Sequence, residues 1–542
     1  MQKSKKSKKS LTAIQIMKVY IRVYNSQLGS VTLSDMTDNG ITKGMIEYNF
    51  GSMSRLDIMS RSKYPTKFKD LRLDEIINSE RKKDKHVEVS KYKRFVVTTV
   101  VTGCKVNKSA LESVKNYCKI KDAKLLLLTC ADPAKRSNYS FGVVDKLVEN
   151  ETIIANDTEL NDNLSLSTIK MSAKQIQPLT GLRRFGQRDG SMIFASPKQH
   201  MMPVHSSRDN LPRLLLTTGC ITESDYDSDR YMSARTSKIA ECDHKLGALI
   251  VEVKDEKTFY VRQIQFDSKG RFADLGKMYS KNEVKDFGVD HIVFGDIHVK
   301  EHHPIVERVH QNMVKRFKPN GVVMHDVFSG ISVNHHEQKN KLTLAKLAER
   351  GDLDLSSELE AVAEFINNYS NKTNVIIPAA NHHDFLVRYL QEFRMKDDPH
   401  NARICLELSL AMLDDKDPVQ QGVTMMGLKN IDKVRWLKRD EDYIIGGSQL
   451  GAHGDKGLNG SKGTLKGLEE SYGNIVAAHV HTPGIFHNAW MVGTSTRYRL
   501  SYTVGPSSWM HSDCLVYSNG MKQMINTING EFTTDKKFLN NF

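Results

Sequence analysis

The sequence predicts an α/β protein with three parts: a small helical region near the N-terminus, an α/β region after it, and a larger α/β domain at the C-terminal end. Three observations predict this organisation. From about residue 95 onward, short apolar runs alternate with amphipathic stretches, as strands and connecting helices do. The last apolar runs end in polar residues that can bind ligands. Sixteen of the twenty histidines lie in residues 291–542, so the last part also differs in composition.

Size and charge limit the classes of protein to which the chain can belong. No apolar run approaches the roughly 18 residues of a membrane span, and the basic start lacks the pattern of a secretory signal. Seven scattered cysteines without a C-x-x-C pair argue against a disulfide framework and favour the reducing cytoplasm. The net charge of +14 favours a polyanionic partner, most commonly nucleic acid. A basic protein with no nucleic-acid role is the alternative.

The first part of the chain is expected to contain a basic arm and a group of helices. Residues 1–10 carry five lysines and are predicted to be disordered. Residues 11–78 are predicted to be helical, with a turn at Asp38-Asn39-Gly40. The helix after this turn resembles the recognition-helix end of TetR-type repressors, which makes Lys43 a candidate DNA contact; a plain helical hairpin is the alternative. Residues 79–94 hold seven Lys or Arg against three acids and are predicted to be a linker.

The second part, residues 95–289, begins with a βαβ-like pattern. Residues 94–103 form an apolar strand pattern, 109–120 an amphipathic helix pattern and 123–131 a second apolar run. Further strands are expected around 212–220, 247–253 and 259–267. No motif with evident chemistry occurs there, so we expect an α/β accessory domain.

The third part, residues 290–542, contains five apolar runs that each lead to oxygen or nitrogen ligands. Because ligands collect at the carboxyl ends of strands in open α/β sheets, we expect these side chains to meet there. Two pairs are spaced i, i+2, and alternate residues of an extended segment project to the same side. The candidate ligands are Asp296, His298, Asp326, Asn381, His453, His479 and His481.

This set of side chains suits two adjacent divalent ions that share one carboxylate. Mixed oxygen and nitrogen ligands without thiolate suit Mn²⁺, Fe, Zn²⁺ or Ni²⁺. Two ions roughly 3.5–4 Å apart can activate a water and stabilise both oxygens of an in-line phosphoryl displacement. Ions would also explain how Asp296 and His298 can end a buried strand, since cations receive their charge and lone pairs.

The order D-x-H, D, N-H, H, H-x-H resembles that of the calcineurin-like metallophosphoesterase superfamily. This resemblance implies a layered αββα domain over residues 290–542. It implies that Asp296, His298 and His481 hold the first ion, that Asp326 bridges, and that the remaining three ligands, Asn381, His453 and His479, hold the second. It also implies that His382 is the catalytic histidine, which contacts the scissile phosphate and protonates the leaving oxygen.

The motifs depart from the family pattern at several places, two of which concern residues beside the site. The bridging acid follows His325 where the family has glycine, so His325 is expected beside the site. The acid that orients the catalytic histidine is displaced by one position, so either His383 or Asp384 orients His382, or the orientation of His382 differs. The glycine-rich stretch 451–463 around His453 is expected to be a substrate-side loop in which Lys456 and Lys462 contact DNA phosphates.

The leading hypothesis is a DNase with two divalent ions, Mn²⁺ first among them. The whole chain also resembles the pre-early DNA-degradation proteins of T-five-like bacteriophages, which implies degradation of host DNA in the bacterial cytoplasm, with other early phage proteins as partners. One alternative is a phosphomonoesterase or small-molecule phosphodiesterase of the same superfamily. Another is a DNA-binding regulator with a structural metal site. The sequence leaves homo-oligomerisation open.

Overall fold

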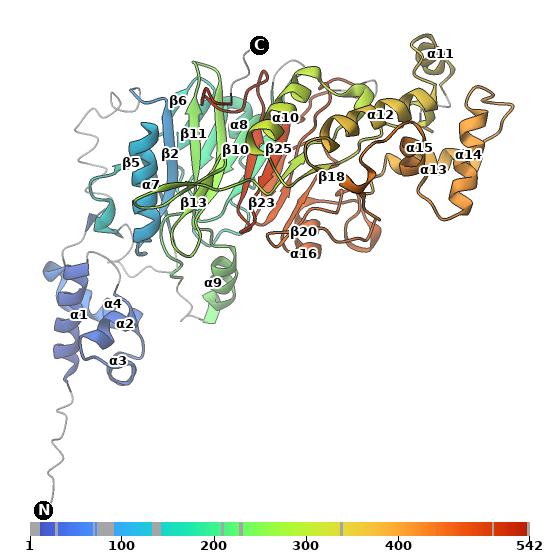
Figure 1. Ribbon diagram of the computed structural model, residues 1–542. Coiled ribbons are helices and arrows are strands. Elements are labelled where there is room, and N and C mark those ends of the chain that lie inside the picture. The colour runs from blue at the N-terminus through green and yellow to red at the C-terminus, as the bar shows by residue number, and fades with distance from the viewer. Residues whose placement is uncertain are drawn as a thin grey trace, which may run out of the picture.

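The computed structural model describes residues 11–27, 31–68, 71–72, 91–132, 143–207, 211–226, 231–336, 340–500, 503 and 505–538 (Figure 1). The expected basic arm and most of the expected linker lie outside these residues. The described residues form helices and several mixed sheets, so the predicted α/β class is confirmed. None of the described helices is both long and apolar enough to cross a membrane.

The N-terminal part forms a separate group of helices in Figure 1: α1 (Ala13–Gln27), α2 (Leu33–Asp38), α3 (Lys43–Phe50) and α4 (Met53–Lys63). The expected turn lies between α2 and α3. Gly40 has φ +82° there, an angle that glycine adopts without strain. Ile41, Ile46 and Phe50 pack into the core of this group. Two helices joined by a turn are therefore present, and the choice between a DNA-binding helix-turn-helix and a plain helical hairpin stays a prediction.

A six-stranded sheet organises the C-terminal part. Its order is β19 (Val434–Trp436), β18 (Asn374–Ile377), β17 (Gly321–Met324), β16 (His291–Phe294), β25 (Ser512–Val516) and β26 (Lys522–Asn526). The four strands from β16 to β19 are parallel, whereas β25 and β26 are antiparallel. Helices fill the connections, as parallel strands require. These are α10 (Pro304–Phe317), α11 (Lys341–Glu349), α12 (Leu355–Ser370), α13 (His383–Glu392), α14 (Ala402–Leu413) and α15 (Pro418–Met425).

A ten-stranded sheet runs across the expected boundary at residues 289 and 290. One half holds β20 (Ile444–Ile445), β21 (Ser448–Gln449), β22 (Ile475–Ala477), β24 (Ala489–Met491) and β23 (Gly484–Phe486). The other half holds β9 (His200–Val204), β10 (Arg213–Thr217), β8 (Ser191–Phe194), β7 (Leu164–Ser167) and β6 (Thr158–Asn161). Strands β23 and β9 pair in the middle, so the two parts of the chain share one sheet.

A five-stranded sheet belongs to the accessory part: β12 (Phe259–Gln265), β11 (Gly247–Val253), β2 (Arg94–Thr102), β3 (Lys124–Ala131) and β5 (Thr152–Ile153). Strands β2 and β3 are parallel and joined by α7 (Lys108–Lys121), as the expected βαβ pattern requires. Helices α8 (Arg183–Asp189) and α9 (Tyr231–Asp243) belong to the same part. Two small sheets complete it, one of β1 (Leu71–Arg72) and β4 (Val143–Val144), the other of β13 (Phe272–Asp274), β14 (Lys277–Tyr279) and β15 (Val284–Asp286).

Packing places these sheets in layers. Val293 and Val323 of the six-stranded sheet share a core with Val476 and Trp490 of the ten-stranded sheet. The alternate residues of β16 and β17 point to the other face, where they pack on α10 and α12. Helix α16 (Leu465–Tyr472) covers the outer face of β22 and β24. The six-stranded sheet therefore packs against helices on one face and against the ten-stranded sheet on the other.

Candidate metal centre

The seven candidate ligands meet where the strands of the C-terminal part end. Asp296 and His298 follow β16, Asp326 follows β17 and Asn381 follows β18. His453 lies beyond β21, while His479 and His481 lie beyond β22. Five of the seven side chains are buried: Asp296, His298, Asp326, His453 and His481. The expected convergence at the carboxyl edge of the strands is present.

Three of these residues form one group. His481 Nε2 lies 3.2 Å from Asp296 Oδ2 and 3.2 Å from His298 Nε2. A nitrogen or oxygen atom from each of the three lies within 4.8 Å of the others. Two ligands bound about 2.0–2.2 Å from one ion lie roughly 3–4 Å apart. The spacing therefore fits one divalent ion.

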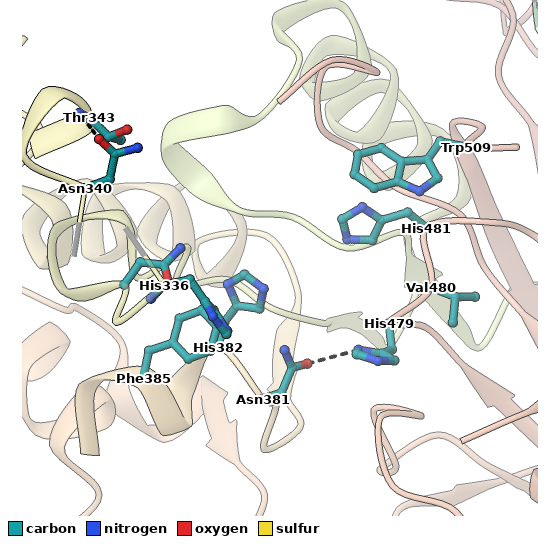
Figure 2. A pocket seen from close by; sticks show the side chains of 11 residues that line it. His336, Asn340, Thr343, Asn381, His382, Phe385, His479, Val480, His481 and Trp509 are labelled. Atoms are coloured by element: carbon teal, nitrogen blue, oxygen red, sulfur yellow. Dashed lines mark hydrogen bonds between the residues drawn. The ribbon is translucent and has the colours of Figure 1, made fainter. Parts of the chain in front are cut away.

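The remaining ligands form a second group that Asp326 joins to the first. Asn381 Oδ1 lies 3.1 Å from His453 Nε2 and 3.0 Å from His479 Nδ1, the contact drawn in Figure 2. Asp326 Oδ2 lies 3.1 Å from His453 Nε2 and 3.8 Å from His298 Nε2. Its carboxylate thus lies between the two groups, the place that a bridging ligand occupies.

Each of the two aspartates has one oxygen atom that accepts no hydrogen bond from the described part of the chain. Among the described residues, Asp296 Oδ1 and Asp326 Oδ1 are buried and accept no hydrogen bond. Burying a carboxylate oxygen in this way is costly unless a cation receives its charge. The donor set of oxygen and nitrogen atoms without sulfur fits Mn²⁺, Fe²⁺ or Zn²⁺. The residues present therefore fit a pair of divalent ions.

Burial and neighbouring charges shift the pKa values of the ionisable groups at the site, often in opposite directions. Burial raises the pKa of Asp296 well above its usual range. Burial also acts to raise the pKa of Asp326, but the surrounding imidazoles, His453 first, hold it well below its usual range. Burial acts to lower the pKa of His453, yet the Asp326 and Asp296 carboxylates outweigh it and raise this pKa to about 9. Burial lowers the pKa of His481 to about 3 and that of His479 to about 4, which keeps both imidazoles neutral and able to bind metal.

Four ligands adopt a left-handed backbone, which corrects the expectation of extended i, i+2 pairs. The φ angles are +47° at His298, +45° at Asp326, +80° at His479 and +57° at His481. Such angles disfavour residues with a Cβ by roughly 1–2 kcal/mol each. The paired side chains therefore converge through bends beyond the strand ends and not through the pleat of a strand. Strain of this kind is commonly found at functional sites.

His382 lies beside the first group. Its Nδ1 donates a hydrogen bond to the carbonyl of Ser329 at 2.7 Å, and its ring centroid lies 4.5 Å from that of His298. Of the three alternatives, the structure favours a different orientation, because the Ser329 carbonyl holds His382 Nδ1. The His383 ring lies near Trp436, with centroids 6.0 Å apart, and Asp384 pairs with Arg439 at 2.8 Å.

The other expected neighbours divide into two kinds. His325 is buried, and its Nδ1 lies 3.4 Å from His453 Nδ1, so it contacts a ligand as expected. The expected DNA contacts are exposed lysines. Lys43 lies on α3 and pairs with Glu47 at 3.5 Å, while Lys456 and Lys462 face each other across the loop beside His453. Their contact with DNA stays a prediction.

A pocket of about 630 Å³ opens over the ligands (Figure 2). Phe385 and Trp509 supply aromatic walls, and the Trp509 ring lies 4.2 Å from that of His481. Asn340 and Thr343, at the start of α11, line the rim. Sequence reasoning missed Phe385, Asn340 and Ser329. Ser329 acts through its carbonyl, which leaves no side-chain signal in a sequence.

Comparison with known proteins gives one informative similarity. No family model matches the chain. The chain is 26% identical over 477 residues to Protein A1 of Escherichia phage T5, and the match covers 82% of this chain and 84% of that protein. The similarity therefore extends over most of both chains and supports a relationship to proteins of T5-like phages.

Proposed function

We propose that this relative of a phage T5 protein is a DNase that hydrolyses phosphodiester bonds with two divalent ions. The observation that carries the proposal is the meeting of seven nitrogen and oxygen ligands in two groups joined by Asp326. The first ion would lie among Asp296, His298 and His481, and the second among the other three ligands, Asn381, His453 and His479. When bound, two such ions activate a water and stabilise the charge of an in-line displacement at phosphorus.

The protein groups then have separate tasks. The Ser329 carbonyl holds Nδ1 of His382, so its Nε2 is the nitrogen left for the substrate. A proton on this Nε2 passes to the leaving oxygen, which is the role of a general acid. Phe385 and Trp509 offer aromatic faces on which a nucleobase can stack.

The layer order of residues 290–542 supports membership of the calcineurin-like metallophosphoesterase superfamily. Two sheets face each other between helices, and the ligands leave the strand ends in the order that this superfamily uses. By the same resemblance we propose Mn²⁺ as the physiological ion. The net charge of +14 and the exposed Lys456 and Lys462 near His453 favour a nucleic acid as substrate.

The similarity to a phage protein suggests the setting. We propose that the enzyme degrades host DNA early in infection, in the bacterial cytoplasm, together with other early phage proteins. This part of the proposal rests on the resemblance to phage DNA-degradation proteins and on the match to Protein A1.

The test compares two substrates in the same preparation. The purified chain is incubated with Mn²⁺ and either plasmid DNA or p-nitrophenyl phosphate, and the Asp326→Ala variant reports contaminating nuclease. We expect the plasmid to be cleaved by the wild type and not by the variant. If p-nitrophenyl phosphate is turned over rapidly while the plasmid stays intact, the proposed function would change from DNase to small-molecule phosphatase. DNA binding without hydrolysis of either substrate in Mn²⁺, Mg²⁺ or Zn²⁺ would favour a regulator.

A further inference from the structure

A second group of ligating side chains lies behind the metal centre. His302 ends the short 3₁₀ helix η4 (Val299–Glu301), while Glu307 and His310 lie three residues apart on α10. One ligand atom from each of the three lies within 4.8 Å of the others. None of these residues takes part in the centre described above.

One ring nitrogen of His310 has no hydrogen-bond partner among the described residues. The side chain is fully buried, and its ring stacks on Phe294 with centroids 3.9 Å apart. Its Nε2 lies 3.0 Å from Asp513 Oδ1, so the carboxylate accepts the Nε2 proton. The lone pair of a neutral imidazole then lies on Nδ1, which is buried and has no hydrogen-bond partner among the described residues. A carboxylate that fixes the tautomer of a histidine in this way is typical of metal ligands.

Glu307 and His302 lie at ligand distance from each other. His302 Nδ1 is 3.8 Å from Glu307 Oε2, which is too far for a hydrogen bond but suits two ligands of one ion. Glu307 is fixed by Tyr369, whose hydroxyl donates to Oε2 at 3.0 Å. His302 is fixed by Phe365, with ring centroids 5.2 Å apart.

Charge also favours a cation here. The Asp513 side chain is buried; Oδ1 accepts from His310 and from the backbone N–H of Gly295, and Oδ2 accepts from no described residue. Within the described ranges, no lysine or arginine forms an ion pair with Asp513. A buried carboxylate is costly unless a cation balances its charge. A divalent ion would balance Asp513 and Glu307 together.

We propose that His302, Glu307 and His310 bind one divalent transition-metal ion, with Asp513 as the residue that orients His310. Two imidazoles and a carboxylate suit Zn²⁺, and Fe²⁺ or Mn²⁺ next. The position indicates a structural role. Asp513 holds Gly295, the residue before Asp296, and η4 joins His298 to His302. The ion would therefore brace the segment that carries the first two ligands of the centre.

Metal counting tests this proposal independently of any nuclease activity. Wild type and variants are stripped with chelator, reloaded with Zn²⁺, freed of excess metal and analysed for ions per chain. We expect Glu307→Gln and His310→Gln each to hold about one ion fewer than wild type. Exposed His400, which pairs with Asp354 at 3.5 Å, supplies the matched control: His400→Gln should keep the wild-type count.

Two further arms make the result decisive. Asp326→Ala should lower the count through the centre while leaving the His302 site loaded, so failure of either site shows separately. Because Glu307→Gln is nearly isosteric and partly exposed, it should fold, which circular dichroism would check. Anomalous diffraction from wild-type crystals soaked in Zn²⁺ should give a peak among the three side chains. An unchanged count in both folded variants, or no such peak, would overturn the proposal.

Discussion

The two halves of the ten-stranded sheet face sheets of similar design, but within the described residues candidate metal ligands gather at only one of them. In the accessory part β2, α7 and β3 form a parallel unit, as β16, α10 and β17 do in the C-terminal part. Each unit buries an aspartate just beyond its second strand, Asp132 after β3 and Asp326 after β17. The two carboxylates have different partners.

In the accessory part, protein groups lie at bonding distance from the buried Asp132 and Thr99 side chains. Lys174 Nζ lies 3.1 Å from Asp132 Oδ2, and Thr99 Oγ1 lies 2.6 Å from Thr218 Oγ1. At the centre, Asp326 is surrounded by imidazoles, and Oδ1 accepts no hydrogen bond from the described residues. The comparison teaches that the architecture does not determine chemistry; the partner offered to a buried charge does.

The largest expected effect separates the two aspartates. Asp326→Ala removes the proposed bridge, so we expect metal content to fall and Mn²⁺-dependent cleavage of plasmid DNA to drop by about a thousandfold or more. Asp132→Ala is the matched variant in the other half and should keep both metal content and cleavage. Equal loss of metal in the two variants would show that the halves do not differ as described.

A substitution at His382 tests the proposed proton transfer separately from metal binding. His382→Gln should keep the metal content of wild type and lower the turnover of DNA by roughly 10²–10⁴-fold, since it removes a general acid. The neighbour His383, whose ring lies near Trp436, provides the control: His383→Gln should keep most of the turnover. Loss of bound metal in His382→Gln would instead make His382 a ligand.

The Asp132–Lys174 pair tests the accessory half. Asp132→Ala removes the buried carboxylate that lies 3.1 Å from Lys174 Nζ, so we expect it to lower the free energy of unfolding by about 3–5 kcal/mol, as measured by urea denaturation. A second change, Lys174→Met in the Asp132→Ala background, should restore part of this loss. Wild-type stability in Asp132→Ala would mean that the pair contributes little.

A smaller effect depends on pH. In chelated protein, the pKa of His453 is raised from 6.5 to about 9, so the protonated imidazole stabilises the fold fully below about pH 6.5. This stabilisation is lost as pH rises toward 9 and amounts to no more than about 3 kcal/mol. Urea unfolding at several pH values should show the decline in chelated wild type and a flatter profile in chelated His453→Gln. A decline that the variant shares would assign it to another group.

The sequence predicted the candidate site better than the arrangement around it. The meeting of the seven candidate ligands could be predicted because each follows an apolar run, a pattern that local residue types encode. The shared ten-stranded sheet could not, because the pairing of β23 with β9 joins segments almost 300 residues apart and leaves no local pattern. The same holds for the Ser329 carbonyl and for the His310–Asp513 contact, which depend on tertiary packing.

The left-handed backbone at His298, Asp326, His479 and His481 implies a trade-off between the proposed catalysis and thermal stability. Glycine adopts these φ angles without strain but has no side chain that could bind an ion. At each position, the residue that best suits the backbone therefore cannot act as a ligand. A laboratory lineage selected only for survival at high temperature should therefore exchange these residues early. The selected protein would be more thermostable but would lack the proposed nuclease activity, unless every round of selection also screens for turnover.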